Sequence, residues 1–192
     1  MKKKIIRALP FKRKNKGITN YKKRIALIRG EKHRLVVRKS LKGMQAAIVE
    51  FNEKGDKVIA SANSKALAKF GWKADNGNIP SAYLTGFLLG KKAKGKNVNE
   101  AVLDIGLSSS IKGSRIYAVV AGIVDSGIKV PHGEDILPPK ERLNGTHISK
   151  YAEMLKNDQS KYQRQFGNYL KNNVDPLHLP KHFEEIKNKL KG

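Results

Sequence analysis

The sequence predicts an α/β protein, with a basic arm before the domain and a helical extension after it. Three β-type runs follow one another between residues 34 and 61 and indicate an antiparallel meander. Apolar residues at helical spacing follow Pro80, and a further apolar run starts at Ala101. Strands and helices that mix in this way are typical of α/β packing.

Residues 1–33 are predicted to be the basic arm. Met1–Asn20 holds a proline, a glycine and too few apolar residues to fold alone, so we expect it to be extended. Between Tyr21 and Gly30 the apolar residues take helical spacing, and Asn20 can cap the first turn. The arm is therefore expected to end in one short helix.

Residues 34–132 are predicted to be the globular domain. Its meander strands are expected at Arg34–Ser40, Gln45–Phe51 and Lys57–Ser61. Ser64 is expected to cap a short helix that ends before Gly71, and the turn before Pro80 opens a longer helix. Ala101–Leu107 is expected to be a buried strand.

The segment Arg115–Asp125 fits two structures. Its β-branched residues favour a strand, whereas its length and Gly127 just beyond it favour a helix. We expect a helix there, followed by a strand at Ile128–Val130.

Residues 133–192 are predicted to be a linker and a helical extension. Gly133–Gly145 contains two adjacent prolines and is expected to be irregular. Three amphipathic patterns follow, at His147–Lys156, Lys161–Asn172 and Lys181–Lys191.

Charge is the most informative property of the composition. The chain carries a formal net charge of +24, and 17 of its 40 lysines and arginines lie in the first 42 residues beside one acid, Glu31. Such a density of like charge repels itself and requires a polyanionic partner. Because Phe11 and Tyr21 stand among these bases, the arm can add stacking to charge attraction, as RNA-binding segments do.

Several classes of protein are disfavoured by composition. The longest apolar run, Ile116–Val124, is nine residues and too short to span a bilayer, so we expect no membrane partner. With no cysteine, the chain has neither disulfides nor thiolate chemistry nor a cysteine-bound zinc, which fits a cytoplasmic location. We expect no cofactor and no metal site.

Five stretches together resemble a known family. They are YKKRIALIRGEKHRLVVRKS (Tyr21–Ser40), ALAKFGW (Ala66–Trp72), GNIPSAYLTG (Gly77–Gly86), AVLDIGL (Ala101–Leu107) and VPHGEDILP (Val130–Pro138). In this order they resemble the eighteenth protein of the large ribosomal subunit in its archaeal and eukaryotic form, the family that binds 5S ribosomal RNA. The long tail after Gly145 and the short total length are similar to archaeal members.

The resemblance implies an α/β domain with a mixed sheet, in which further strands join the antiparallel meander and helices pack on the sheet. It also implies a ribonuclease-H-like layout without its chemistry, hence a protein that is not an enzyme. It also implies that the protein docks on the ribosome, at the central protuberance of the large subunit. Its partners would be 5S ribosomal RNA, the large-subunit ribosomal RNA and neighbouring large-subunit proteins, including the other 5S-binding protein.

Candidate RNA contacts lie in the arm, at the start of the meander and at the ends of its strands. The cations of the arm and first strand are expected to meet phosphates, Tyr21 to stack on a base or to fix the arm helix to the sheet, and the polar residues near strand ends to bond 2′-hydroxyls. The full set is Lys12, Arg13, Lys14, Lys16, Tyr21, Lys22, Lys23, Arg24, Arg29, Lys32, His33, Arg34, Arg38, Ser40, Lys42 and Asn63.

Two other functions are weighed against this one. A metal-dependent nuclease would use Asp104, but two-metal hydrolysis needs several converging carboxylates, and only Glu100 and Asp125 could join it. A structural Asp104 is therefore favoured. A DNA-compacting protein fits the charge but not the stretch GNIPSAYLTG.

Overall fold

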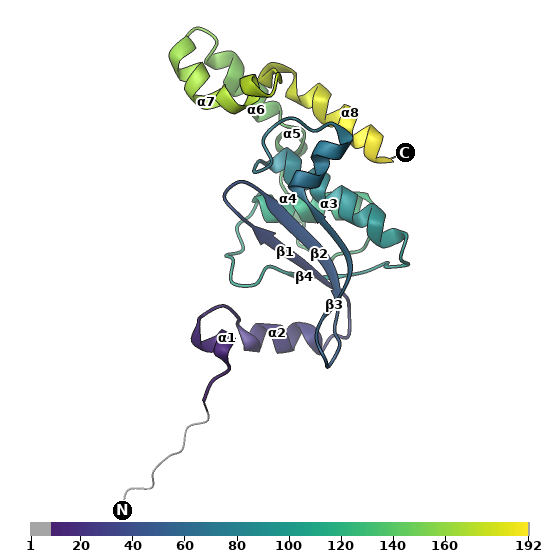
Figure 1. Ribbon diagram of the computed structural model, residues 1–192. Helices are drawn as coiled ribbons and strands as arrows, with labels where there is room; N and C mark the ends of the chain where they lie inside the picture. The colour runs from purple at the N-terminus through teal and green to yellow at the C-terminus, as the bar shows by residue number, and fades with distance from the viewer. Residues whose placement is uncertain (1–8, 192) are drawn as a thin grey trace, which may run out of the picture.

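The computed structural model describes residues 9–191, whose elements are arranged in three regions (Figure 1). α1 (Lys12–Asn15) and α2 (Tyr21–Ile28) lie at one end, the sheet and its helices in the middle, and the C-terminal helices at the other end. The expected extended arm falls partly on residues 1–8, outside the described residues. Within the described part it is wrong at α1, where Lys16 N–H bonds back to the Lys12 carbonyl and closes a helical turn.

Four strands form one mixed sheet in the order β3-β2-β1-β4. Their bounds are Arg34–Lys39 for β1, Met44–Glu50 for β2, Lys57–Asn63 for β3 and Val102–Asp104 for β4. β1 and β3 run antiparallel to β2, whereas β4 runs parallel to β1. The predicted meander, the mixed sheet and the α/β class are confirmed.

The two faces of the sheet differ because side chains alternate along each strand. Leu35 and Val37 of β1 and Ile48 of β2 are fully buried on the face that packs against α3 (Ile79–Lys94) and α4 (Arg115–Asp125). On the opposite face β1 presents Val36 and Arg38. That face lacks α3 and α4, and there Val36 is half-buried and Arg38 exposed, whereas Arg34 on the same face is buried.

α3 and α4 form the helical layer, and the predicted helix at Arg115–Asp125 is confirmed. The two helices cross at glycines. A Cβ added to Gly86 would lie 2.1 Å from the Val119 carbonyl oxygen, and one added to Gly122 would lie 2.1 Å from the Tyr83 carbonyl oxygen. Their backbones are therefore in direct contact, which larger residues would prevent.

The predicted cap of the helix after β3 is wrong. The short helix η1 (Ser64–Phe70) is capped by Asn63, whose side chain accepts the Ala66 N–H at 2.8 Å. Ser64 is instead buried and accepts the Met44 N–H at 3.0 Å. The extended backbone of Asn63 suits an N-cap, while Ser64 already belongs to the first turn.

The later strands are shorter than predicted. β4 stops at Asp104, and Gly106, with a φ of 63°, turns the chain away. The expected strand Ile128–Val130 is wrong, because only Lys129 pairs, through a single parallel bridge to Glu100. The next pairing donor would be residue 131, a proline without an N–H.

The C-terminal extension is helical at the three predicted places, with bounds shifted by about two residues, as is usual at helix ends. Its helices are α6 (Thr146–Met154), α7 (Gln159–Lys171), η3 (Pro176–His178) and α8 (Leu179–Lys191). The segment expected to be irregular contains two short helical turns, η2 (Glu134–Ile136) and α5 (Lys140–Leu143). No helix among the described residues is both long and apolar enough to cross a bilayer.

The extension shares its core with the domain. Phe183 of α8 contacts the Tyr83 ring of α3, with ring centroids 5.4 Å apart. His182 stacks on Trp72 at 5.2 Å and accepts the Lys73 N–H through Nε2 at 3.4 Å. The C-terminal helices are thus anchored to the globular domain by aromatic packing.

Candidate nucleic-acid interface

The arm helices present most of their cations to solvent. α1 and α2 lie wholly within the described range, and neither contains a buried residue. Asn20 caps α2 as predicted, accepting the Lys23 N–H at 3.1 Å. The exposed members of the candidate set on the arm are Lys12, Arg13, Lys14, Lys16, Lys22, Lys23, Arg29 and Lys32.

The aromatic residues of the arm contact each other. The rings of Phe11 and Tyr21 lie 5.0 Å apart and are tilted by 39°. Phe11 keeps 70% of its surface exposed, while Tyr21 is half-buried. Through this contact Tyr21 joins the segment before α1 to α2. This arrangement was not among the two roles expected for Tyr21.

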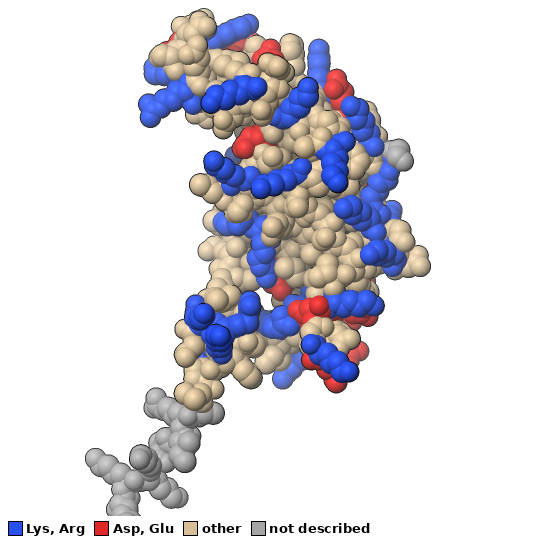
Figure 2. Space-filling view, in the orientation of Figure 1, with Lys and Arg blue, Asp and Glu red and all other residues tan. Residues whose placement is uncertain are grey.

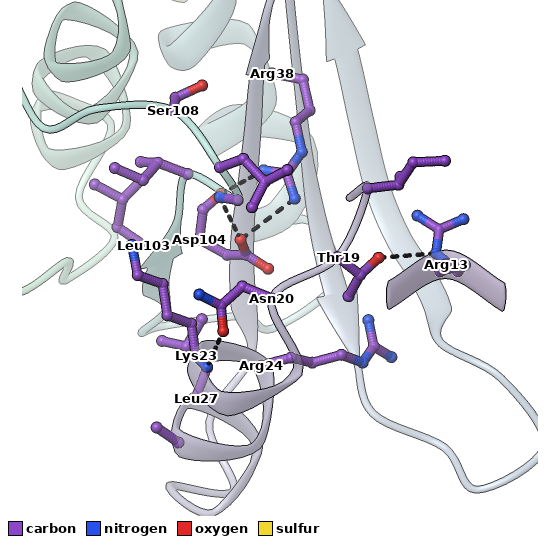
Figure 3. Close-up of a pocket in the computed structure, with 15 residues that line it drawn as sticks. Arg13, Thr19, Asn20, Lys23, Arg24, Leu27, Arg38, Leu103, Asp104 and Ser108 are labelled. Carbon is purple, nitrogen blue, oxygen red and sulfur yellow. Dashed lines mark hydrogen bonds and ion pairs between the residues drawn. The ribbon is translucent and has the colours of Figure 1, made fainter. Parts of the chain in front are cut away.

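A pocket of about 750 Å³ lies between α2 and the β4 edge of the sheet (Figure 3). Lys23 and Arg24 line it from α2, Arg38 from β1, and Asp104 and Ser108 from β4 and the loop that follows. The pocket therefore gathers basic and polar groups from three separate segments of the chain.

Two aspartates hold this region together. Asp104 Oδ1 accepts the Gly106 N–H at 2.8 Å and lies 3.3 Å from Arg38 Nη2, and the Arg38 Nη1 donates to the Asp104 carbonyl at 2.7 Å. The other carboxylate oxygen of Asp104 lies 3.3 Å from Arg34 Nη1. The structural role predicted for Asp104 is what the geometry shows.

Asp56, in the turn between β2 and β3, joins the arm to the sheet. Its carboxylate accepts two hydrogen bonds from Arg24 of α2, at 2.9 and 3.0 Å, and lies 2.6 Å from Arg34 of β1. Burial raises the pKa of Asp56, but the hydrogen bonds and charges of Arg34 and Arg24 outweigh it, so the pKa lies below its ordinary value. This aspartate was not among the sequence-predicted residues, because an Asp in a Gly-Asp turn is ordinary.

Arg34 is the one buried residue among the candidate RNA contacts. It is 2% exposed, and its guanidinium lies between Asp56 and Asp104. A side chain enclosed by two carboxylates cannot reach a phosphate, so we assign Arg34 a structural role. Arg24 and Arg38 are also paired but remain partly exposed.

The remaining candidates lie at two places. Lys32 pairs with Glu100 at 3.0 Å at the surface, and His33 is half-buried beside it, with its carbonyl accepting the Val102 N–H. Ser40 and Lys42 belong to the turn after β1, where the Ser40 hydroxyl donates to the Gly43 carbonyl at 3.1 Å. Asn63 caps η1 at this same end of the sheet, since it pairs with Gln45, next to that turn.

On the open face of the sheet, two members of the candidate set lie beside polar residues outside that set. A pocket of about 390 Å³ is lined there by Arg38, Gln45, Ser61, Asn63 and Lys92, among others. Lys92 donates to the Ser61 carbonyl at 3.1 Å, and Lys96 donates to the Ile59 carbonyl. These two lysines, one in the last turn of α3 and one just after it, therefore occupy carbonyls of the edge strand β3, a protection typical of sheet edges.

Lysines and arginines are spread over the arm, the sheet region and the C-terminal lobe on the face that Figure 2 shows. Together with the pocket between arm and sheet, they define a basic α/β protein of the RNA-binding class. The family model described as "Ribosomal large subunit proteins 60S L5, and 50S L18" matches residues 8–99 and 91–133. The chain belongs to this family of large-subunit ribosomal proteins.

A curated relative extends the match through the C-terminal helices. The large ribosomal subunit protein uL18 of Methanococcus maripaludis is 48% identical over 182 residues, which cover 95% of this chain and 94% of that protein. Because this archaeal relative aligns over nearly the whole chain, the predicted archaeal form of the family is confirmed.

Proposed function

We propose that the chain is a structural component of the cytoplasmic large ribosomal subunit that binds 5S ribosomal RNA and anchors it to the large-subunit RNA at the central protuberance. Family membership supports the ribosomal role. RNA binding is supported chiefly by the arm, whose exposed cations lie beside the polar pocket between α2 and the sheet. Neighbouring large-subunit proteins, including the other 5S-binding protein, would contact the rest of the surface.

The mechanism follows from where the cations are held. Asp56 and Asp104 fix Arg24, Arg34 and Arg38, so the surface beneath the arm is rigid before RNA arrives. The free lysines of α1 and α2 then neutralise phosphates and release counterions, while the fixed pocket sets the register. The arm supplies affinity and the sheet supplies position.

A salt titration tests the electrostatic part. If about 6 to 10 phosphates are neutralised, affinity for 5S RNA falls roughly 10³- to 10⁵-fold between about 50 and 200 mM salt, by analogy with duplex DNA. Filter binding at several salt concentrations measures the slope. An affinity that does not change with salt would show that the arm's cations do not bind phosphates. Competition with duplex DNA at fixed salt separates this function from DNA compaction.

We propose a structural role in place of catalysis. Asp104, which the nuclease alternative requires, is engaged by Arg34 and Arg38. Among the described residues, no group of three His, Asp or Glu side chains converges as a metal site. We expect no RNA hydrolysis with magnesium or manganese above a purified blank. Hydrolysis that Asp104→Asn abolishes would establish the nuclease.

We propose that the domain has a ribonuclease-H-like layout, supported by the mixed strand order β3-β2-β1-β4 and by α3 and α4 on one face.

A further inference from the structure

A pocket of about 590 Å³ lies where the C-terminal helices meet the domain, at the opposite end of the sheet from the arm. Its walls come from the turn after β1, the segment before α3, and helices α6 and α7. Figure 2 shows a hollow beneath the C-terminal lobe, with lysines or arginines on both sides of it. The volume is within the roughly 300 to 1,000 Å³ of small-molecule pockets, so a single nucleobase fits.

One wall of this pocket is aromatic. Phe166 of α7 lies 6.1 Å from the Tyr151 ring of α6 and 5.8 Å from the Tyr169 ring, as measured between ring centroids. Phe166 and Tyr169 are buried, whereas Tyr151 is 44% exposed. Phe166 packs against Tyr151 and is itself packed against Tyr169, while Tyr151 keeps part of its surface available to a flat ligand.

Neutral hydrogen-bonding groups also line the pocket. Asn78 Nδ2 donates to the Tyr169 hydroxyl at 3.1 Å. Burial raises the pKa of Tyr169, so its hydroxyl is neutral. Gln165 and Asn168 stand one turn apart on α7, exposed, and their side-chain amides bond to no other described residue. Such amides are suited to the edges of bases.

The helix that forms part of the aromatic wall carries only basic charges. α7 contains Lys161, Arg164 and Lys171, which lie outside the pocket lining, and no acidic residue, while Lys42 is the one lysine or arginine among the lining residues. Asp75 is the one carboxylate among the lining residues. A peptide side chain would use the aromatic wall but leave the amides and cations without partners. A nucleotide uses all three, because its base stacks, its edges bond and its phosphate meets a cation.

We propose that this pocket binds one unstacked base of single-stranded RNA, with Tyr151 as the stacking residue and Gln165 and Asn168 at the base edge. The site is separate from the arm, and it rests on the proposed function only in that RNA is the partner. It makes the C-terminal extension a second point of RNA attachment, held at a fixed distance from the first by the sheet.

Short RNA tests the site in the full-length protein. The probes are fluorescein-labelled single-stranded hexamers of each base, titrated at constant salt. Tyr151→Ala should weaken the best-bound hexamer about tenfold, within the range known for loss of one base–aromatic stack. Tyr151→Phe should retain wild-type affinity because it keeps the ring. Gln165→Ala should weaken binding, whereas Gln163→Ala, an exposed glutamine of the same helix outside the pocket, should not.

A second measurement locates the contact. Hexamers that carry one 4-thiouridine should crosslink, on irradiation, to peptides from α6 and α7. Thermal melts of each variant show that it is folded. The proposed RNA site would be wrong if crosslinks were confined to the arm or if Tyr151→Ala bound hexamers as well as the wild type does. Either result would also be the one expected if a protein occupied the pocket.

The two proposals fail in different ways. If 5S RNA binds with the expected salt slope but hexamers are insensitive to Tyr151→Ala, the pocket alone is wrong. If the pocket binds hexamers but 5S RNA is not preferred over a control RNA of equal length, the proposed function alone is wrong.

Discussion

Arg34 of β1 and Asp56 of the β2–β3 turn form an ion pair in which Nη2 lies 2.6 Å from Oδ2. The arginine is buried, so its charge depends on this carboxylate and on Asp104. Asp56 also binds Arg24 of α2. One carboxylate therefore joins the start of the sheet to the RNA-binding arm.

Replacing Asp56 by Asn should reduce the free energy of unfolding by about 2 kcal/mol. The change leaves a buried guanidinium with one charged partner, and such losses range up to about 3 to 5 kcal/mol when both partners are fully buried. Urea denaturation measures the effect. Glu50→Gln is the control, because Glu50 and Lys57 form an exposed pair at 3.9 Å, worth at most about 1 kcal/mol. Equal losses in the two variants would contradict the role of Asp56.

Deleting Met1–Lys32 should leave a cooperatively folded domain that binds 5S RNA at least about a hundredfold more weakly, which corresponds to roughly 2.7 kcal/mol. The described part of this segment contains no buried residue, and its ion pairs to Asp56 and Glu100 are partly exposed. Circular dichroism and filter binding measure the two properties. Near-normal affinity would place the RNA site in the domain, and an unfolded product would make the arm part of the core.

Gly122→Ala should destabilise the protein by about 3 kcal/mol, because the new methyl group would meet the Tyr83 carbonyl at the helix crossing. Gly167→Ala is the matched control. This glycine also lies within a helix, but a Cβ there meets nothing within 4 Å, so the variant should gain up to about 1 kcal/mol. Thermal and urea melts of both variants would show the difference. A small loss of stability in Gly122→Ala would mean that α3 and α4 can move apart without cost.

Acidification should loosen the C-terminal extension. Burial lowers the pKa of His182, more than the nearby carboxylate of Glu185 raises it. Since the unfolded ring binds a proton that the folded ring does not, the stabilisation is complete above about pH 6.5 and is lost as the pH falls through the lower folded pKa. The melting temperature should therefore fall between about pH 7.5 and pH 5.

A pair of histidine variants tests this assignment. His182→Gln should flatten the pH dependence in part, because His147, whose pKa burial also lowers, still contributes. His178→Gln, at an exposed position in η3, should leave the wild-type slope. If the melting temperatures of all three proteins changed equally with pH, His182 would be excluded as the source of the pH dependence.

Local sequence signals determined much of the architecture. Asn20 before α2, the Asn78–Pro80 start of α3 and the alternation along β1 each act within a few residues, so they predict elements without knowledge of the fold. The concentration of bases in the arm likewise requires a polyanion wherever the arm is placed.

Only the tertiary structure decided which of these bases are free. In sequence Arg34 looks like its basic neighbours, yet it is buried, because Asp56 and Asp104 reach it from a turn and from the parallel strand β4. The single pairing of Lys129, the glycine crossing of α3 and α4 and the pocket beneath α7 depend in the same way on segments far apart in the chain. Helix caps and strand patterns are set by neighbouring residues, whereas burial and ion pairing are set by contacts that exist only after the chain has folded.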